Sequence, residues 1–341
     1  MREKNIIFNF NKMKRFTLTF GLITGLCFLG IPASAEPSGL IDVIRSQEGV
    51  TSLTGPSCQE LTQQERFLRL WTLNVGETPG PASVAVENAD HSLCSLVINN
   101  SVPSIVHLLQ DFKTTFSGPN CWNTTLRLSR LIQLSRFSSA EEMSFWMTSP
   151  YCRELSKTEK PLPGDIIAIR GEKPNQPGAF DEIHGMIYLS DDLVFSKNTS
   201  SSMSPYGIQR ANLVYQIFRT ADPKCTKVQG RPEDCYRWVN HYRCTSSEKD
   251  QLDLEKENSD FSSLSGELKE IESQLSEYVM NGQGNYDNNK EVIQKRLTDI
   301  EGKTLKLPKT PGKASFFAKA LLQKINSLKV QTVILSKQPP R

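Results

Sequence analysis

The sequence is poor in two things that would narrow its function at once, histidine and net charge. It contains four histidines, and its 40 basic and 37 acidic side chains leave a net charge of +3. A chain this close to electroneutral gives no argument for a nucleic acid partner. Zinc spacing is also missing, because Cys225, Cys235 and Cys244 stand too far apart for a C-x₂₋₄-C site. We therefore expect no metal and no other cofactor.

Long apolar runs are also scarce, and the one that stands out is too short and wrongly flanked for a stable membrane span. Basic residues between positions 12 and 15 precede the run FTLTFGLITGLCFLGI, which is followed by Pro-Ala-Ser-Ala at 32–35. A basic start, a short apolar run and an A-x-A site are the features of a secretory signal peptide. We predict cleavage after Ala35 and a periplasmic or secreted protein without a stable membrane span.

Two alternatives concern this leader. Met13 is a second candidate start, because the MKRF that begins there supplies the basic region by itself. Cys27 would be the lipid attachment site of a lipoprotein, but Leu26 precedes it where a small residue is needed. The apolar run also continues past Cys27, which favours the cleaved signal peptide.

Export changes the meaning of the cysteines, because an oxidising compartment favours disulfides. Loss of Cys27 leaves an odd number, which implies either an intermolecular bond or a free thiol. The seven are Cys58, Cys94, Cys121, Cys152, Cys225, Cys235 and Cys244. We expect three disulfides and one free cysteine. The expected pairs are Cys58 with Cys94, and two of Cys225, Cys235 and Cys244 with each other.

Periodicity divides the mature chain into three parts. Residues 36–115 look mostly helical, with a capping box at Thr62 and Glu65. Residues 116–244 begin with helical patterns, one of them at 139–146 with Ser139 as its cap, and change to β-branched strands after Pro161, which predicts an α+β core.

The third part, residues 245–341, is set apart by its charges. Residues 245–301 hold 14 acidic and 6 basic side chains, whereas residues 302–341 hold 9 basic ones and no acidic one. Apolar residues recur three and four apart, which predicts a helical hairpin or small bundle with its basic last helix on its acidic first. Binding of the basic end to anionic cell-wall polymers is the weaker alternative.

One cysteine stands where a nucleophile would be expected. The stretch GPNCWNTTLRLSRL places Cys121 where a Gly-Pro turn gives way to a helical pattern. A helix N-terminus favours negative charge and lowers the pKa of a thiol. A nucleophilic thiol also needs a base to take its proton and a group that orients the base.

His184 is the histidine that we expect to be this base. It lies 63 residues after Cys121 on a predicted strand, Glu182 to Leu189, whose rigidity would hold the ring in one geometry. The other three are His91, His107 and His241. The alternative interpretation of His184 is a partly exposed strand residue. The Cys-Trp pair at a helix start, the expected export and the odd cysteine count together favour the base.

The orienting residue depends on the length of the turn that follows. A three-residue loop at 190–192 would place Asn198 opposite His184, whereas a two-residue loop would place Lys197 on that face. We favour Asn198, because its amide oxygen can accept the second ring proton and a cationic lysine cannot.

These residues together resemble a known family. Cys-Trp at a helix start, the strand PGDIIAI and the run HGMIYLSDDLVF look like the papain-like cysteine hydrolases, closest to the NlpC-type cell-wall peptidases. The resemblance covers residues 115–210. It implies a thiol helix packed on an antiparallel sheet, with Cys121 as nucleophile, His184 as base and peptidoglycan or another peptide as substrate. An ungapped match would put the third family residue at Ser196.

The match departs from the family at two points. The family has Asp-Cys-Ser or a near variant where this chain has Asn120-Cys121-Trp122, and glycine follows His184 one position early. By the resemblance, the backbone N–H of Cys121 would stabilise an oxyanion, with Asn120 and Trp122 near the substrate.

The sequence features are consistent with three functions. The favoured one is an exported cysteine endopeptidase or amidase that acts on cell-wall peptides. A transglutaminase-like acyl transferase would use the same residues, with an amine in place of water. A disulfide-stapled secreted binding or structural protein would have Cys121 paired, for example with Cys152.

Overall fold

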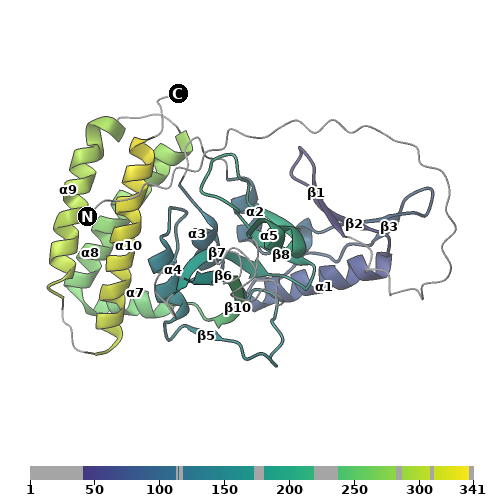
Figure 1. Cartoon of the computed structure of the whole chain (residues 1–341), viewed down its shortest axis with the longest axis horizontal. Coiled ribbons are helices and arrows are strands. Elements are labelled where there is room, and N and C mark those ends of the chain that lie inside the picture. The colour runs from purple at the N-terminus through teal and green to yellow at the C-terminus, as the bar shows by residue number, and fades with distance from the viewer. Residues whose placement is uncertain are drawn as a thin grey trace, which may run out of the picture. The chain divides into compact units, whose positions relative to one another are not determined.

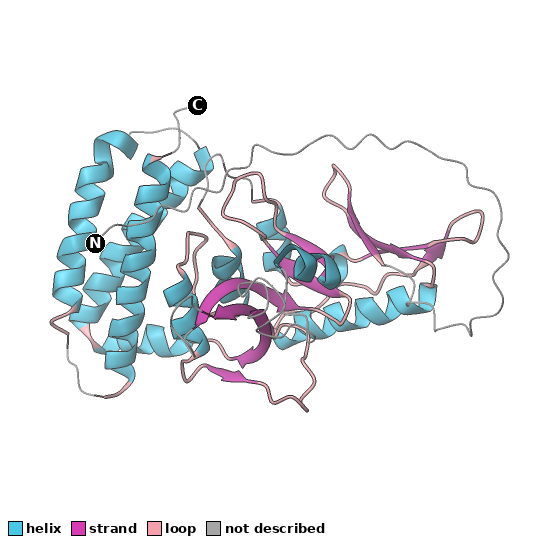
Figure 2. Cartoon of the chain, in the orientation of Figure 1, coloured by secondary structure: helices cyan, strands magenta, loops and turns pink. Residues whose placement is uncertain are grey.

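The computed structural model describes residues 41–112, 114, 118–172, 180–218, 237–281, 286–307 and 311–337. Within these ranges the chain is mixed α/β with antiparallel sheets (Figures 1 and 2). The predicted signal peptide at 1–35 lies outside them, and so do Cys225 and Cys235. No described helix is both long enough and apolar enough to cross a membrane.

The N-terminal part contains a four-stranded sheet. Its strands, in the order β1-β2-β4-β3, are β1 (Asp42–Arg45), β2 (Thr51–Gly55), β4 (Cys94–Val97) and β3 (Val86–Glu87). Its helices are α1 (Cys58–Asn74), the 3₁₀ helix η1 (Asn99–Ser101) and α2 (Ser104–Gln110). The prediction of a mostly helical segment is therefore wrong for the strands. They are too short for their alternation to stand out against the apolar face of α1. The helix start predicted at Thr62 is also wrong, because α1 begins at Cys58 and Ser57 caps it.

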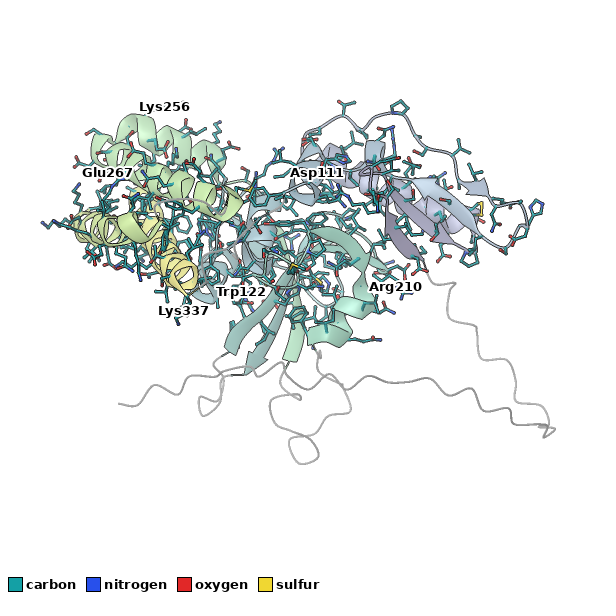
Figure 3. The ribbon with its side chains drawn as sticks, turned by 90° about the horizontal axis from the view of Figure 1, so that it is seen from above. Asp111, Trp122, Arg210, Lys256, Glu267 and Lys337 are labelled. Atoms are coloured by element: carbon teal, nitrogen blue, oxygen red, sulfur yellow. A yellow bond between two sulfur atoms is a disulfide. The ribbon has the colours of Figure 1, made fainter. Side chains whose placement is uncertain are left out.

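Contacts on both sides fix this sheet. The predicted disulfide between Cys58 and Cys94 is present and joins α1 to β4. Arg45 of β1 pairs with Asp111, and Arg210 pairs with Asp42 at 3.5 Å (Asp111 and Arg210 are labelled in Figure 3).

The central part is a six-stranded antiparallel sheet in the order β5-β10-β6-β7-β8-β9. Its strands are β5 (Cys152–Glu154), β6 (Ile166–Glu172), β7 (Phe180–Tyr188), β8 (Leu193–Ser196), β9 (Gly207–Arg210) and β10 (Arg237–Cys244). Its helices are α3 (Cys121–Leu128), α4 (Ala140–Met147) and α5 (Ala211–Phe218). The predicted α4 begins as expected, because Ser139 Oγ accepts the N–H of Glu142 at 3.1 Å.

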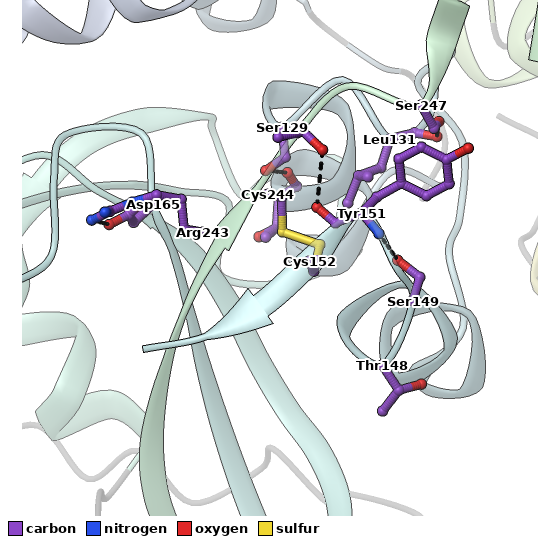
Figure 4. Close-up of a disulfide and its surroundings, with 12 residues drawn as sticks. Ser129, Leu131, Thr148, Ser149, Tyr151, Cys152, Asp165, Arg243, Cys244 and Ser247 are labelled. Carbon is purple, nitrogen blue, oxygen red and sulfur yellow. Dashed lines mark hydrogen bonds and ion pairs between the residues drawn. A yellow bond between two sulfur atoms is a disulfide. The ribbon is translucent and has the colours of Figure 1, made fainter. Parts of the chain in front are cut away.

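The two faces of this sheet pack against different helices. Ala168 and Ile187 belong to the large core that contains Leu126 of α3, whereas Ile167 and Met186 pack with Val214 of α5. Alternation along β6 and β7 produces this division. At one edge of the sheet, a disulfide between Cys152 and Cys244 joins β5 to β10, and Arg243 beside it bonds Asp165 (Figure 4).

The C-terminal part is helical, as the apolar spacing predicts. Its helices are α7 (Glu248–Glu257), α8 (Ser259–Asn281), α9 (Tyr286–Thr304) and α10 (Lys313–Ser336). The long helices α8, α9 and α10 lie side by side and bury a common apolar seam (Figure 1). The expected packing of the basic last helix on the acidic first one occurs, since Lys324 of α10 pairs with Glu272 of α8. Lys329 of α10 also bonds Glu301 of α9 at 2.6 Å, and Lys313 bonds Asp250 of α7 at 2.7 Å.

A buried charge network joins this bundle to the central part. Arg136, only 2% exposed, donates to Glu142 of α4 at 2.7 Å and to Glu272 of α8 at 2.7 Å. Lys324 of α10 pairs with the second oxygen of Glu272. Two cations and two anions therefore neutralise one another, with Arg136 and both carboxylates buried and Lys324 partly exposed. Removal of one buried member leaves an uncompensated charge.

We predict that Arg136→Met destabilises the protein by about 3–5 kcal/mol, because it leaves the buried Glu142 without its cation. Urea unfolding followed by tryptophan fluorescence measures the loss. Arg153→Met is the matched control, since Arg153 pairs with Glu159 at the surface. Equal midpoints for the two variants would contradict the role given to Arg136.

Candidate active site

Asn120 holds the start of α3, the helix that begins with Cys121. It is the N-cap residue, and its Oδ1 accepts the N–H of Asn123 at 3.1 Å. The same amide donates to the carbonyl of Ser138 at 2.7 Å and accepts the N–H of Ser138 at 3.3 Å. The predicted helix start is confirmed. Asn120, expected near the oxyanion, uses its amide to fix this start to the segment before α4.

The thiol of Cys121 is free and nearly buried, with 7% of the residue exposed. Burial raises its pKa to about 11, although the backbone N–H groups of Gly185, Trp122 and Cys121 and the charge of Lys197 act in the opposite direction. The expectation of a lowered pKa is therefore wrong, because the loss of water outweighs the helix N-terminus. At neutral pH Cys121 is a thiol.

Gly185 allows α3 to approach β7. A Cβ at this position would lie 2.8 Å from Thr125 Oγ1 and 3.3 Å from Met143 Cε, so a larger residue would push the helix away. The backbone N–H of Gly185 is directed at the thiol of Cys121. The peptide that joins His184 to Gly185 therefore lies beside the sulfur. In the sequence, this contact is marked by Gly185 standing directly after His184, one position earlier than the family pattern has its glycine.

The ring of His184 is completely buried and stacks on Phe218 of α5, with ring centroids 3.8 Å apart. Its Nε2 lies 2.9 Å from Ser196 Oγ. Its Nδ1 is buried and has no hydrogen-bond partner among the described residues, so no hydrogen bond joins the ring to Cys121. Burial lowers the pKa of His184 to about 3, and the ring is neutral at physiological pH.

The register of β7 and β8 decides which residue lies opposite His184 across the hairpin. Ile187 pairs with Phe195 and Tyr188 with Val194, which leaves the predicted three-residue loop at 190–192. Continued along the strands, this register sets Asn198 opposite His184.

Ser196 is nevertheless the residue that touches the ring. Its hydroxyl donates to Asn198 Oδ1 at 3.0 Å. A hydroxyl has one hydrogen, so Ser196 Oγ must accept the hydrogen on Nε2 of His184. The structure therefore joins both sequence candidates in one chain of hydrogen bonds. This leaves Nδ1 with its lone pair.

Lys197, the third candidate, points toward the thiol side of the sheet. It is 2% exposed, and its ammonium donates to the carbonyls of Ser201, at 2.8 Å, and Ser204. Burial lowers its pKa to about 8, and the charge of Cys121 acts in the other direction. Lys197 therefore supplies positive potential to the sulfur and does not orient the imidazole.

Trp122, the residue after Cys121, carries a buried polar group without a hydrogen-bond partner in the described part of the chain, as His184 does at Nδ1. Its indole N–H is buried and has no partner among the described residues.

The described residues also include one group with metal-ligand spacing, Cys58, Glu87 and Cys94. Both sulfurs of that group are in a disulfide, so they are not thiolate ligands.

Comparison with known proteins found no similar protein. No family model, no curated protein and no solved structure matches the chain. The two described disulfides are compatible with a secreted protein. The residues and their geometry therefore carry the functional argument.

The burial of His184 predicts a loss of stability in acid. Its pKa is about 3 in the folded protein against 6.5 for the free side chain, so below pH 6.5 the unfolded chain binds a proton that the folded one does not. Between pH 6.5 and 5 the protein should lose about 1.6 kcal/mol more than His184→Gln. Urea titrations of both proteins at these pH values measure the difference, and parallel curves would contradict it.

The pKa of Cys121 predicts how the native thiol reacts. Because this pKa is about 11, alkylation by iodoacetamide should speed up about tenfold per pH unit from pH 7 to 10. Peptide mapping by mass spectrometry, without reduction, identifies the modified cysteine. A rate that levels off below pH 8 would instead indicate a preformed thiolate–imidazolium pair.

Proposed function

We propose that this protein is an exported cysteine hydrolase with a papain-like core, in which Cys121 is the nucleophile and His184 the base. The proposal rests first on architecture. A helix that begins with a free thiol packs on an antiparallel sheet, and Gly185 of β7 lies at the contact. The side chain of the preceding residue, His184, lies on the opposite face of that strand, against Phe218 of α5. The resemblance of residues 115–210 to papain-like hydrolases agrees with this arrangement.

One observation carries the assignment of roles. The Nδ1 atom of His184 is buried and unpartnered, while Ser196 and Asn198 hold the Nε2 hydrogen on the other side of the ring. A buried polar atom without a partner is rare and calls for an explanation. This lone pair is a free acceptor of the kind that a nucleophilic thiol needs, but the ring faces α5, so it can serve Cys121 only after a rearrangement of β7.

The reaction would begin from neutral groups. As Cys121 Sγ attacks an amide carbonyl, its proton would pass to Nδ1 of His184 once that ring has reached the α3 face of β7. The negative charge on the carbonyl oxygen would be stabilised by the backbone N–H of Cys121, with the unpaired indole N–H of Trp122 as a further donor. The imidazolium then protonates the leaving amine, and the C–N bond breaks to leave a thioester on Cys121.

The second half regenerates the enzyme. His184 removes a proton from water, the resulting hydroxide adds to the thioester, and the C–S bond breaks. The sulfur recovers its proton from the imidazolium. Lys197, buried without a described carboxylate partner, favours the thiolate in both halves of the reaction. Cell-wall peptides are the proposed substrates because of the expected signal peptide and the resemblance to NlpC-type peptidases.

A second candidate is a secreted binding or structural protein without catalysis. The pairing of Cys121 expected for it is absent, since Cys121 is free and Cys152 is bonded to Cys244. The support for this candidate is the burial of both groups, since Cys121 is 7% and His184 0% exposed. In that case the two would be core residues, and neither would react with substrate.

We expect the mature protein to release soluble fragments from purified peptidoglycan, measured by mass spectrometry. Cys121→Ala and His184→Ala should each lower the rate by at least about 100-fold. His91→Ala is the matched control, because His91 is an exposed histidine far along the chain from the site. Activity that survives in Cys121→Ala would contradict the proposal.

An added primary amine separates hydrolysis from acyl transfer. A hydrolase gives free carboxylates, whereas a transglutaminase-like enzyme gives amides of the added amine. A wild-type protein that cleaves neither peptidoglycan nor simple peptides, with Cys121 inert to alkylation, would favour the candidate without catalysis.

A further inference from the structure

Gln209 of β9 extends the hydrogen-bond chain of His184 by one residue. Its Oε1 accepts the amide N–H of Asn198 at 2.8 Å. Its Nε2 donates to the backbone carbonyl of Ser196 at 3.3 Å. Gln209 is thus bonded to the side chain of one member of the chain and to the backbone of another.

The backbone carbonyl of Ser196 fixes which group donates and which accepts in each of these hydrogen bonds. A carbonyl oxygen can only accept, so the atom of Gln209 that faces it must be the NH₂ group. The other end of that amide is then an oxygen, which forces Asn198 to present its own NH₂ to Gln209. Asn198 therefore presents Oδ1 to Ser196, and the hydroxyl must donate to it.

This order of donors and acceptors ends at His184. Because Ser196 uses its one hydrogen on Asn198, it accepts from Nε2–H of the imidazole. If the amide of Asn198 were turned over, its NH₂ would donate to Ser196, and the hydroxyl would donate to Nε2. The hydrogen of the ring would then sit on Nδ1, where it cannot accept a thiol proton.

We infer that Gln209 is a positioning residue that selects the Nε2–H tautomer of His184 by fixing the amide of Asn198. This inference rests on the proposed function only for its catalytic consequence, since the tautomer is a property of the resting protein. Among the described residues, Asn198 makes hydrogen bonds to Ser196 and Gln209 alone. Without Gln209, nothing described distinguishes the two orientations of that amide.

The test compares the wild type with Gln209→Met, which keeps the side-chain length and removes both hydrogen bonds. Long-range ¹H–¹⁵N NMR of ¹⁵N-histidine-labelled protein at pH 8 reports which ring nitrogen carries the hydrogen. His184→Gln identifies the signals of His184. The wild type should be Nε2–H throughout. In Gln209→Met the two orientations of the Asn198 amide should differ in free energy by no more than about 1 kcal/mol, the worth of one hydrogen bond. Roughly a tenth or more of the variant should therefore be Nδ1–H.

Two further variants separate selection of the tautomer from simple support of the fold. Gln64→Met removes an amide hydrogen bond to Asp192, in the loop of the same hairpin, and should leave the tautomer unchanged. Asn198→Asp added to Gln209→Met should restore Nε2–H, because both oxygens of a carboxylate accept from Ser196. A merely structural defect would not be corrected by that second change.

The outcomes are decisive in each direction. A His184 that stays entirely Nε2–H in Gln209→Met overturns the inference. So does a double variant that keeps the Nδ1–H form. A wild type without hydrolase activity would defeat the proposed function but leave the tautomer result standing, because the NMR measurement needs no substrate.

Discussion

The buried guanidinium of Arg136 is the interaction on which the rest of this structure depends. It bonds Glu142 at the start of α4 and Glu272 in α8, so one cation joins the sheet part to the helical bundle. Ser138, two residues later, is bonded through both backbone groups to Asn120, the cap of the thiol helix. The position of Cys121 is thus tied, through a few side chains, to a bundle that begins more than a hundred residues later.

The bundle reinforces this segment directly. Ser327 of α10 accepts the backbone N–H of Ser139 at 2.9 Å and donates to Glu142 at 2.7 Å, and Gln331 accepts the N–H of Phe137 at 3.2 Å. These contacts assign a role to a region whose sequence showed only charge asymmetry and helical spacing. The C-terminal helices form one side of the scaffold that places the candidate nucleophile.

What could be predicted from the sequence is what depends on neighbours along the chain. The cap at Ser139, the helix start at Cys121, the three-residue loop after β7 and the helical spacing after residue 245 are local patterns. The Cys58–Cys94 bond also came from the sequence, as a guess about nearby cysteines. The four-stranded N-terminal sheet did not, because its pairing joins short segments across loops and α1.

The site shows the same limit. Cys121, His184 and Asn198 could be named from residue type and spacing, and Ser196 from the family resemblance. The sign of the thiol pKa could not, because it depends on burial by distant segments. Gln209 gave no signal, since an amide on a short strand is unremarkable until its partners are known. The direction of the hydrogen bonds that reach His184 depends on one backbone carbonyl, which no side-chain pattern can reveal.

The disulfide between Cys152 and Cys244 joins two residues whose sequence separation is 92 and encloses the strands of the central sheet. His184, Ser196, Asn198 and Gln209 all lie inside that covalent ring, whereas Cys121 lies outside it. A protease that cuts the chain once within the ring leaves two pieces that sulfur still joins. Surroundings that preserve disulfides are often rich in proteases, and there the sheet can keep its strands together after a cut that would separate an unbridged chain.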